Sequence, residues 1–404
     1  MVAVDVVVVG AGPVGCAGAL RLHHAGLRVL LLERSAWDRV SPPQLTSITP
    51  RALHDVESLG LAAPIREACV TRGITFRMIS HRGAEVRKQH PPSEARLYFH
   101  RPPVDLAMRR RVASSGVPHQ AGVRRVEPLV HGGRVTGVRY ENADGEHTVQ
   151  AALVLAADGR GSRLARAVSL PAAEVGFQRV YQGRLLATDA WPDDTLAVLG
   201  TGMPGVTFLV FSWRREAGRA VYVELETDLA RHPEALSTAS GGPEAHFERA
   251  ARSQPGLAGL LAASHPIEEH SAVTLMGVRR TRLFVPGMCL VGDAAATVDP
   301  IGSSGMLLGV QGVVDLAERI IRDGVAGCDY RAWEQGHLAR VREIARYAAL
   351  LRSSVDHPWR MDLAARVMAA VPLAREHALG TMNGTRPFTE MWSPSRMWSL
   401  LRGN

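Results

Sequence analysis

A glycine-rich turn near the N-terminus constrains the fold of this chain more than any other feature. Val4 to Val9 is an apolar, mostly β-branched run, which predicts a parallel strand buried on both faces. The turn Gly10-Ala11-Gly12-Pro13-Val14-Gly15 follows it, and a helical pattern then extends from Pro13 to His24 and ends at Gly26. A GxGxxG turn between a buried strand and a helix is typical of a dinucleotide-binding βαβ unit.

Each glycine of this turn has its own expected role. Gly10 permits the tight turn, Gly12 leaves room for a pyrophosphate, and Gly15 lets the helix pack close to the strand. Glu33 follows the second strand, expected over residues 28–32, where its carboxylate can accept hydrogen bonds from an adenosine ribose. An acid at this place favours FAD or NAD over NADP. Arg34, the next residue, is expected to join the cofactor contacts.

Two later motifs also follow predicted buried strands. Asp158 and Gly159 lie in the stretch Ala157-Asp158-Gly159-Arg160-Gly161-Ser162, after a strand expected over 152–157. Gly292-Asp293-Ala294-Ala295 follows a strand expected over 289–291, and Asp299-Pro300-Ile301-Gly302-Ser303-Ser304-Gly305 then opens a long helix. With these three motifs in this order, residues 1–330 resemble the FAD-dependent aromatic hydroxylases, the class A flavoprotein monooxygenases of the para-hydroxybenzoate hydroxylase type.

The resemblance implies a set of cofactor contacts. Arg101 matches an arginine that contacts FAD, and Asp158 and Gly159 match a motif that serves both FAD and the reduced nicotinamide. Asp293 matches the acid that binds the flavin ribityl chain or its neighbouring phosphate. The residues that match the loop and helix start facing the isoalloxazine ring are Pro300, Gly302, Gly305 and Met306. FAD is expected to bind non-covalently, with NAD(P)H as co-substrate.

The fold class expected is α/β. A Rossmann-like FAD-binding domain would be assembled from residues 1–70, 100–175 and 275–330, and an inserted, β-sheet-rich substrate domain from residues 71–99 and 176–274. Two hairpins are predicted in the inserted domain, over residues 74–87 and 207–226. Residues 331–404 are expected to form a C-terminal helical segment that contains Trp359, Trp392 and Trp398.

The composition excludes several classes of protein. No apolar run in the 404 residues is long enough to span a membrane. The formal charge of +8 comes from scattered arginines without a basic block, which disfavours nucleic acid as a partner. The four cysteines form no CxxC pair, so neither a metal site nor a disulfide framework is predicted, and a cytoplasmic location is expected. A homodimer is left open.

The activity that the resemblance implies is oxygen insertion. One atom of O₂ would pass, through a flavin C4a-hydroperoxide, to a small aromatic or polycyclic substrate of specialised metabolism. Two other functions stay open: an FAD-dependent reductase or dehydrogenase of the prenyl reductase type without oxygen insertion, and a non-catalytic flavin-binding protein. A flavin halogenase is disfavoured because the sequence has no GWxWxIP motif and its one lysine, Lys88, lies in a hairpin region.

The sequence also departs from the hydroxylase pattern. Gln44 stands where the family usually has an arginine that contacts cofactor phosphate, Ala296 stands where a histidine is frequent, and Ser303-Ser304 replace the usual Gly-Gln. None of these changes removes FAD binding. They leave open how the reduced nicotinamide docks and whether it is the direct reductant.

Candidate substrate contacts lie in the inserted domain. Ser212 and Arg214 share one face of a predicted strand by the period-2 rule, and a hydroxyl beside an arginine can bind a carboxylate. If that face points outward, Arg214 is the exposed start of a turn and the pocket is apolar, which is the alternative we favour. Tyr181, Trp213 and Tyr222 are expected either to line an aromatic pocket or to belong to the core. The sequence singles out no catalytic residue.

Overall fold

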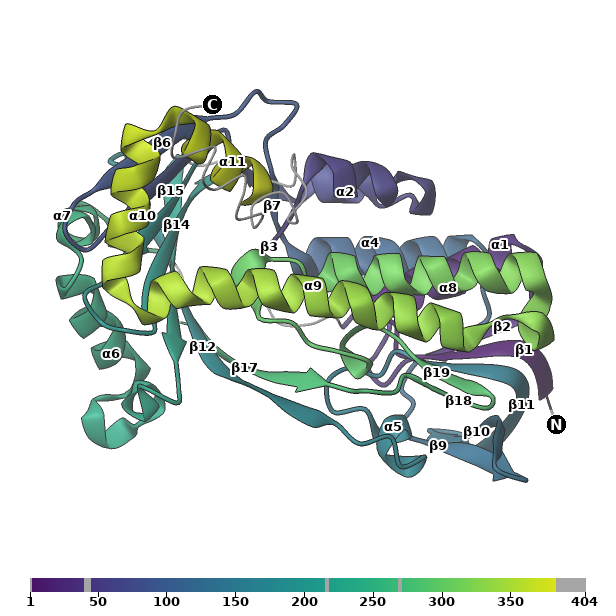
Figure 1. Cartoon of the computed structure of the whole chain (residues 1–404). Helices are drawn as coiled ribbons and strands as arrows, with labels where there is room; N and C mark the ends of the chain where they lie inside the picture. Colours follow the sequence, from purple (N-terminus) through teal and green to yellow (C-terminus); the bar gives the residue numbers. More distant parts are fainter. Residues whose placement is uncertain (1, 40–44, 215–217, 268–270, 383–404) are drawn as a thin grey trace.

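The chain folds around two large β-sheets and one small sheet, with helices on their faces (Figure 1). The structure is a computed structural model that describes residues 2–39, 45–214, 218–267 and 271–382. Gln44, Trp392 and Trp398 therefore lie outside the described residues. The α/β fold class expected from the sequence is confirmed, with a Rossmann-like unit, an inserted β-rich part and C-terminal helices.

The first sheet contains the predicted N-terminal βαβ unit. β1 pairs in parallel with β2 on one side and with β11 on the other, and β11 pairs in parallel with β19. Val6, Val7 and Val8 of β1 are fully buried, as the β-branched run predicts. The strands of this sheet are β18 (Phe284–Val285), β19 (Met288–Leu290), β11 (Gly145–Ala156), β1 (Val2–Val9), β2 (Val29–Leu32), β8 (His119–Gln120), β10 (Arg134–Asn142) and β9 (Arg125–His131).

The sequence pattern also indicates a short strand over residues 147–149, and in the structure this segment and the strand expected over 152–157 form one continuous strand, β11. Its first half pairs antiparallel with β10, and its second half is buried between β1 and β19. The change of environment along one strand explains the difference. The half beside β10 has a polar, alternating pattern, and the other half has an apolar one.

Helices cover the first sheet (Figure 1). α1 and α8 lie very close together: a Cβ atom on Gly18 of α1 would be 2.7 Å from the Val313 side chain of α8. α1 has the predicted bounds. The sequence pattern also indicates helices over residues 106–115 and 307–322; α4 begins five residues before the first range, and α8 begins two residues before the second. The helices of this part are α1 (Pro13–His24), α2 (Pro50–Asp55), α3 (Ala62–Glu67), α4 (Arg101–Ser114), α5 (Arg163–Ala167) and α8 (Gly305–Gly327).

The second sheet is antiparallel except for one parallel pair, β13 with β5. Both predicted hairpins are confirmed, as β5–β6 and β14–β15. The strands are β16 (His265–Pro266), β12 (Ala173–Ala187), β15 (Arg219–Asp228), β14 (Val206–Arg214), β13 (Thr195–Gly200), β5 (Thr75–Ile79) and β6 (Glu85–Gln89), with β17 (Ser271–Arg279) paired to β12.

The two faces of the second sheet have different neighbours. Phe208 and Val223 face α6 (Gly242–Arg252) and α7 (Pro255–Ala262), where they join a core around Phe247. Since side chains alternate along a strand, Leu209 and Phe211 point to the other face. That face packs against α10 (Pro358–Ala370) and α11 (Pro372–Met382).

The small sheet was not predicted. Its strands are β3 (Leu45–Ile48), β7 (Leu97–His100) and β4 (Cys69–Arg72), which pair antiparallel in that order. This sheet joins segments from both sides of the domain boundaries expected near residues 70 and 100. β17 likewise crosses the boundary expected at 275. The division into an FAD-binding and a substrate domain stays a prediction.

α9 (Tyr330–Asp356) connects the two halves of the molecule. It lies beside α8 at one end and reaches α10, beside the second sheet, at the other (Figure 1). As far as residue 382, the C-terminal segment is helical as predicted, and Trp359 is 55% exposed. None of the helices in the described part of the chain combines the length and the apolarity that crossing a membrane requires.

Candidate functional site

The glycine turn forms a cradle at the end of β1. Gly10 has a φ of +107°, and a Cβ atom there would be 2.3 Å from the carbonyl oxygen of Ala157. A Cβ atom on Gly15 would be 1.8 Å from the carbonyl oxygen of Gly10. Around Gly12, by contrast, no atom lies within 4 Å of such a Cβ position. The first and third glycines are therefore required by packing, and the second faces open space at the start of α1, where a pyrophosphate can approach.

Glu33 is buried beside this cradle. Its Oε2 atom accepts a hydrogen bond from the Ala11 backbone N–H at 2.7 Å, and its Oε1 atom accepts one from Ser35 N–H at 2.8 Å. The carboxylate thus connects the end of β2 to the glycine turn, and each oxygen keeps a lone pair for a ribose hydroxyl. Arg34, next to it, points to solvent.

Arg109, in α4, belongs to the same corner, and sequence reasoning missed it. Its Nε donates to the Ala11 carbonyl at 3.1 Å, and its Nη1 donates to the carbonyls of Ala36, Trp37 and Arg39. Its Nη2 lies 3.6 Å from Glu33 Oε2. These partners are 70 to 98 residues away along the chain, so no local pattern indicates the role of this arginine.

The Asp158-Gly159 motif lies at the carboxyl end of β11. Asp158 Oδ2 accepts the backbone N–H of Arg163 at 2.9 Å, at the start of α5, while Oδ1 is buried without a hydrogen-bond partner in the described part of the chain. Gly159 has a φ of +82°. A buried carboxylate oxygen without a donor indicates a missing polar group, and a cofactor hydroxyl or a water fits that need.

Asp293 lies at the carboxyl end of β19. Its side chain is accessible to solvent, yet the surrounding protein atoms raise its pKa, and the positive charges of Arg160 and Arg101 oppose that shift. The Asp293 carboxyl is thus open to a ligand although protein atoms surround it. Arg101 itself forms an ion pair with the buried Asp105 at 3.0 Å.

The loop after Asp293 turns sharply into α8. Asp299 Oδ1 accepts the backbone N–H of Ile301 at 3.1 Å, and Ser303 has a φ of +50°. Gly302 is buried, and Gly305 is the first residue of α8. Met306 packs against the core of the first sheet. Pro300 lies at the edge of a pocket described below.

These segments meet at the carboxyl ends of the parallel strands, which is where α/β sheets bind their ligands. The open space at Gly12, the half-satisfied Asp158 and the accessible Asp293 fit FAD, which carries phosphates and many hydroxyl groups. The individual FAD contacts remain predictions. Bound at this edge, FAD would supply hydride chemistry to whatever occupies the adjoining pocket.

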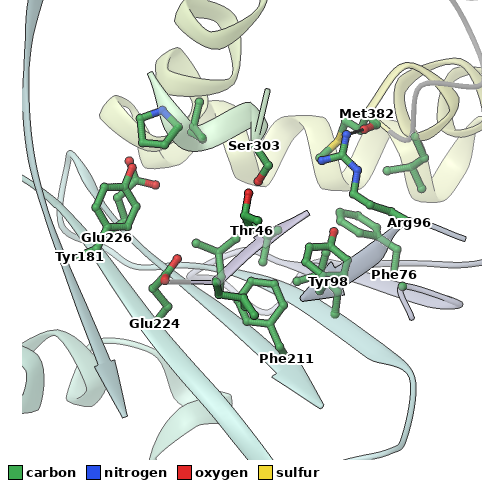
Figure 2. A pocket seen from close by; sticks show the side chains of 18 of the residues that line it. Thr46, Phe76, Arg96, Tyr98, Tyr181, Phe211, Glu224, Glu226, Ser303 and Met382 are labelled. Carbon is green, nitrogen blue, oxygen red and sulfur yellow. Dashed lines mark hydrogen bonds between the residues drawn. The ribbon is translucent and has the colours of Figure 1, made fainter. Parts of the chain in front are cut away.

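A pocket of about 850 Å³, counting its open mouth, lies between the Pro300–Ser303 loop and the second sheet. Figure 2 shows Ser303 entering it from one wall, with Phe76, Tyr98 and Phe211 gathered toward the other. Tyr98 and Phe211 have ring centroids 5.1 Å apart. The apolar and aromatic side chains of the lining come from six strands, the Pro300–Ser303 loop and α11: Leu45, Phe76, Tyr98, Tyr181, Leu196, Val198, Leu209, Phe211, Pro300, Ile301, Leu379 and Met382.

One end of the pocket is closed by a buried charge network. Arg352, from α9, bonds Glu226 of β15 and lies 2.6 Å from Asp299 Oδ1. Arg179, from β12, lies 2.7 Å from Asp228 and 3.7 Å from Asp299. Two guanidinium groups are thus shared among three carboxylates. The network joins α9 and the second sheet to the loop that enters α8, and no local sequence signal indicated it.

Tyr181 and Glu224 lie beside this network and line the pocket. The Tyr181 hydroxyl is buried without a hydrogen-bond partner in the described ranges, and burial beside Glu226 raises its pKa. Burial also raises the pKa of Glu224, to about 8, and the charge of Glu226 adds to that shift. Of the two positions expected for Tyr181, in a pocket wall or in the core, the structure places it in the pocket wall. Trp213 and Tyr222 pack against each other, 5.6 Å apart, and are not among the lining residues.

Ser212 and Arg214, the candidate substrate contacts, do not line this pocket. Ser212 Oγ is hydrogen-bonded to Thr71 Oγ1 at 2.6 Å and accepts the Thr195 N–H at 3.0 Å. Arg214 is 54% exposed and forms an ion pair with Asp194 at 2.8 Å. Ser212 and Arg214 do not point into the pocket, because side chains alternate along β14 and both residues lie on the face opposite to Leu209 and Phe211. The position of Arg214 agrees with the outward alternative, whereas Ser212 is buried.

A dinucleotide cradle at the edge of a parallel sheet, with a mostly apolar pocket against its last loop, defines an FAD-dependent oxidoreductase. The chain belongs to the FAD binding domain family, whose model matches residues 3–323. It is 32% identical to digeranylgeranylglycerophospholipid reductase 1 of Methanopyrus kandleri over 75% of this chain and 76% of that protein. It is 29% identical to the menaquinone reductase of Mycolicibacterium smegmatis, over 86% and 84% of the two chains.

The fold also resembles that of solved flavoproteins. The flavin-dependent brominase Bmp2 has a TM-score of 0.77 over 95% of this chain and 94% of its own, at 19% identity. At that identity the likeness shows the fold alone. The prediction of oxygen insertion by an aromatic hydroxylase is wrong, because the two relatives named above, which match over most of the chain, are reductases. The prediction rested on motifs that indicate the cofactor, and these motifs do not specify the reaction.

Proposed function

We propose that this protein is an FAD-dependent reductase that hydrogenates a carbon–carbon double bond in the isoprenoid chain of a lipid. The support begins with the two relatives named above. Digeranylgeranylglycerophospholipid and menaquinone differ in their head groups, but both carry isoprenoid chains. The shared chemical feature is therefore a long, branched, unsaturated hydrocarbon.

The pocket lining carries the proposal. Its wall is formed mainly by aliphatic and aromatic side chains. Two charged side chains of the wall already have partners within the protein: Arg96 donates to the Met382 carbonyl at 2.9 Å, and Glu226 accepts from Arg352. Such a wall favours a hydrocarbon chain, because burying apolar area contributes about 25 cal/mol per Å². It offers little to an anionic aromatic substrate.

In this function the residues of the chain hold and shield the reacting bond. Leu209 and Phe211 would pack against the isoprenoid chain of the substrate and hold it near the Ser303 loop. The apolar lining would exclude water from the reduced cofactor. FAD supplies the hydride when bound and reduced. NAD(P)H is proposed as the source of those electrons, and dithionite can replace it in a test.

The test is an anaerobic reaction of the FAD-loaded protein, reduced with dithionite or NAD(P)H, with geranylgeraniol or menaquinone in detergent micelles. Mass spectrometry should show products that have gained two hydrogen atoms per reduced bond, and fragmentation should locate them in the isoprenoid chain. Leu209→Trp, which fills the pocket, should abolish the gain while FAD content stays unchanged. Products altered only in the quinone ring, or no product from either lipid, would contradict the proposal.

A further inference from the structure

Glu224 is the pocket carboxyl that has no side-chain partner among the residues that the structure describes. It lies on β15 and extends into the pocket from the strand wall, while Ser303 enters from the loop wall (Figure 2). The residue paired with it on β14 is Leu209, and the one on β12 is Gly183, neither of which has a polar side-chain atom. Within the described ranges, no hydrogen bond or ion pair to another side chain holds the Glu224 carboxyl.

The neighbouring acid shows the contrast. Glu226, two residues along the same strand face, is fully buried and bonded to Arg352, with Arg179 3.9 Å away. The nearby cations are thereby shared among Glu226, Asp228 and Asp299. Glu224 lies in a partly buried, mostly apolar place beside the Glu226 anion, and no cation of residues 2–39, 45–214, 218–267 or 271–382 forms an ion pair with it.

These surroundings favour the protonated form of the Glu224 carboxyl. Burial raises its pKa to about 8, and the charge of Glu226 contributes to the shift. The other titratable groups of the pocket are Tyr181 and Glu226 near the network, and His90, Arg96 and Tyr98 on the lining contributed by the β6–β7 segment. Arg352 approaches from α9 but is engaged by Glu226 and Asp299. The carboxyl can therefore donate a proton to a molecule bound in the pocket.

We propose that Glu224 is the proton donor of the reduction: its carboxyl O–H gives a proton to one carbon of the substrate double bond while the other carbon receives a hydride from reduced FAD. This inference rests on the proposed function. The π bond, the carboxyl O–H bond and the bond that holds the hydride on the reduced flavin would break, two C–H bonds would form, and the double bond would be reduced as the flavin is oxidised. Glu224 is left as a carboxylate, which takes a proton from solvent before the next turnover.

The kinetic test compares Glu224→Gln with Glu85→Gln, a partly exposed glutamate on β6 that pairs with Arg77. Glu224→Gln should lower kcat for geranylgeraniol about 100-fold or more, with KM and FAD content unchanged, because an amide cannot replace the acid. The wild-type rate should fall as pH rises through about 8, and the variant should lose that dependence. Glu224→Asp should restore part of the rate, and Glu85→Gln should match the wild type.

A second measurement needs no turnover. Infrared spectra of the FAD-loaded wild type, minus those of Glu224→Gln, should contain the C=O band of a protonated carboxyl at pH 7, and the band should vanish as pH rises through about 8. A carboxylate at pH 7, or undiminished kcat in Glu224→Gln, would overturn the donor role alone. A wild type that reduces neither lipid, although the band is present, would overturn the proposed function and the donor role with it.

Discussion

At the scale of single residues, neighbouring polar side chains on the same strand serve different purposes. Ser212 is buried and hydrogen-bonded to Thr71 and Thr195, so it connects β14 with β4 and β13. Arg214, two residues later, is exposed and pairs with Asp194 at the surface. A hydroxyl beside an arginine can indicate a carboxylate site, but here each group already has its partner within the protein.

The pair gives a prediction about stability and substrate binding. Ser212→Ala should lower the free energy of unfolding by about 1–3 kcal/mol, because it leaves the buried Thr195 N–H without its acceptor. Arg214→Ala should lower it by less than about 1 kcal/mol, since surface ion pairs contribute little. Urea unfolding measures both. Neither variant should change KM for an isoprenoid substrate, and a raised KM in Arg214→Ala would return that residue to the pocket.

At the scale of elements, the glycine turn separates folding from cofactor binding. Gly15→Ala should prevent the native packing of α1, because its Cβ would be 1.8 Å from the Gly10 carbonyl oxygen. Gly12→Ala should fold normally, since nothing lies within 4 Å and the backbone there, with a φ of −75°, suits any residue. It should nevertheless bind FAD less tightly, because the methyl group occupies the space expected for the pyrophosphate.

Thermal unfolding without flavin and fluorescence titration with FAD measure these two effects. Unchanged FAD affinity in Gly12→Ala would mean that the pyrophosphate lies elsewhere. A normally folded Gly15→Ala would mean that the turn can open without cost.

α9 provides a second element-scale prediction. Arg352→Met leaves the buried Glu226 and Asp299 without their closest cation, so it should lower the free energy of unfolding by about 3 kcal/mol or more. Arg340→Met, on the same helix, removes an exposed pair with Asp315 and should change it by less than about 1 kcal/mol. If both variants lower the free energy of unfolding equally, the charge network does not stabilise the packing of α9 on the second sheet.

Elements with local signals were predicted well. α1 begins at Pro13 and ends before Gly26, as its start and stop residues indicated, and the β14–β15 hairpin lies where its alternating pattern put it. The small sheet escaped prediction because its strands have only four residues each and β7 pairs with β3, about fifty residues earlier. Short strands with distant partners carry no periodic signal of their own.

The candidate site also has a part that local sequence motifs indicate and a part that depends on distant contacts. The glycine turn and the acids that follow parallel strands are local motifs, and the structure brings them to one edge of the first sheet. The pocket combines residues from Leu45 to Met382, and its polar end depends on Arg352 meeting Glu226 across 126 residues. Such contacts arise only when the second sheet and α9 pack together, so no motif could have indicated Glu224.

At the scale of the whole molecule, buried titratable groups shape the response to pH. Burial lowers the pKa of His246 and of His337, each to about 4, from an ordinary value of 6.5. Stability from these histidines is present above pH 6.5 and is lost as pH falls toward 4. Glu224 acts in the opposite sense, because its raised pKa makes stability decline as pH rises from about 4.5 to about 8.

Added together, the contributions of His246, His337 and Glu224 to the free energy of unfolding predict a maximum of stability near pH 6.5. Each unbalanced proton changes the free energy of unfolding by about 1.4 kcal/mol per pH unit. Between pH 8 and 6.5 the stability should rise as pH falls, and below 6.5 the two histidines should outweigh Glu224. Urea unfolding over this range tests it: Glu224→Gln should flatten the alkaline side, and His246→Gln should flatten the acid side.

The strand order of the first sheet also has a consequence for synthesis on the ribosome. β1 is made first, but its neighbour β11 needs β19 (Met288–Leu290) at its other edge, and the glycine face of α1 needs α8 (Gly305–Gly327). A nascent chain that has not yet released these segments keeps the apolar surfaces of β11 and α1 uncovered. Chains stalled before residue 288 should therefore be digested readily by protease and held by chaperones, whereas chains that have released α8 should become resistant.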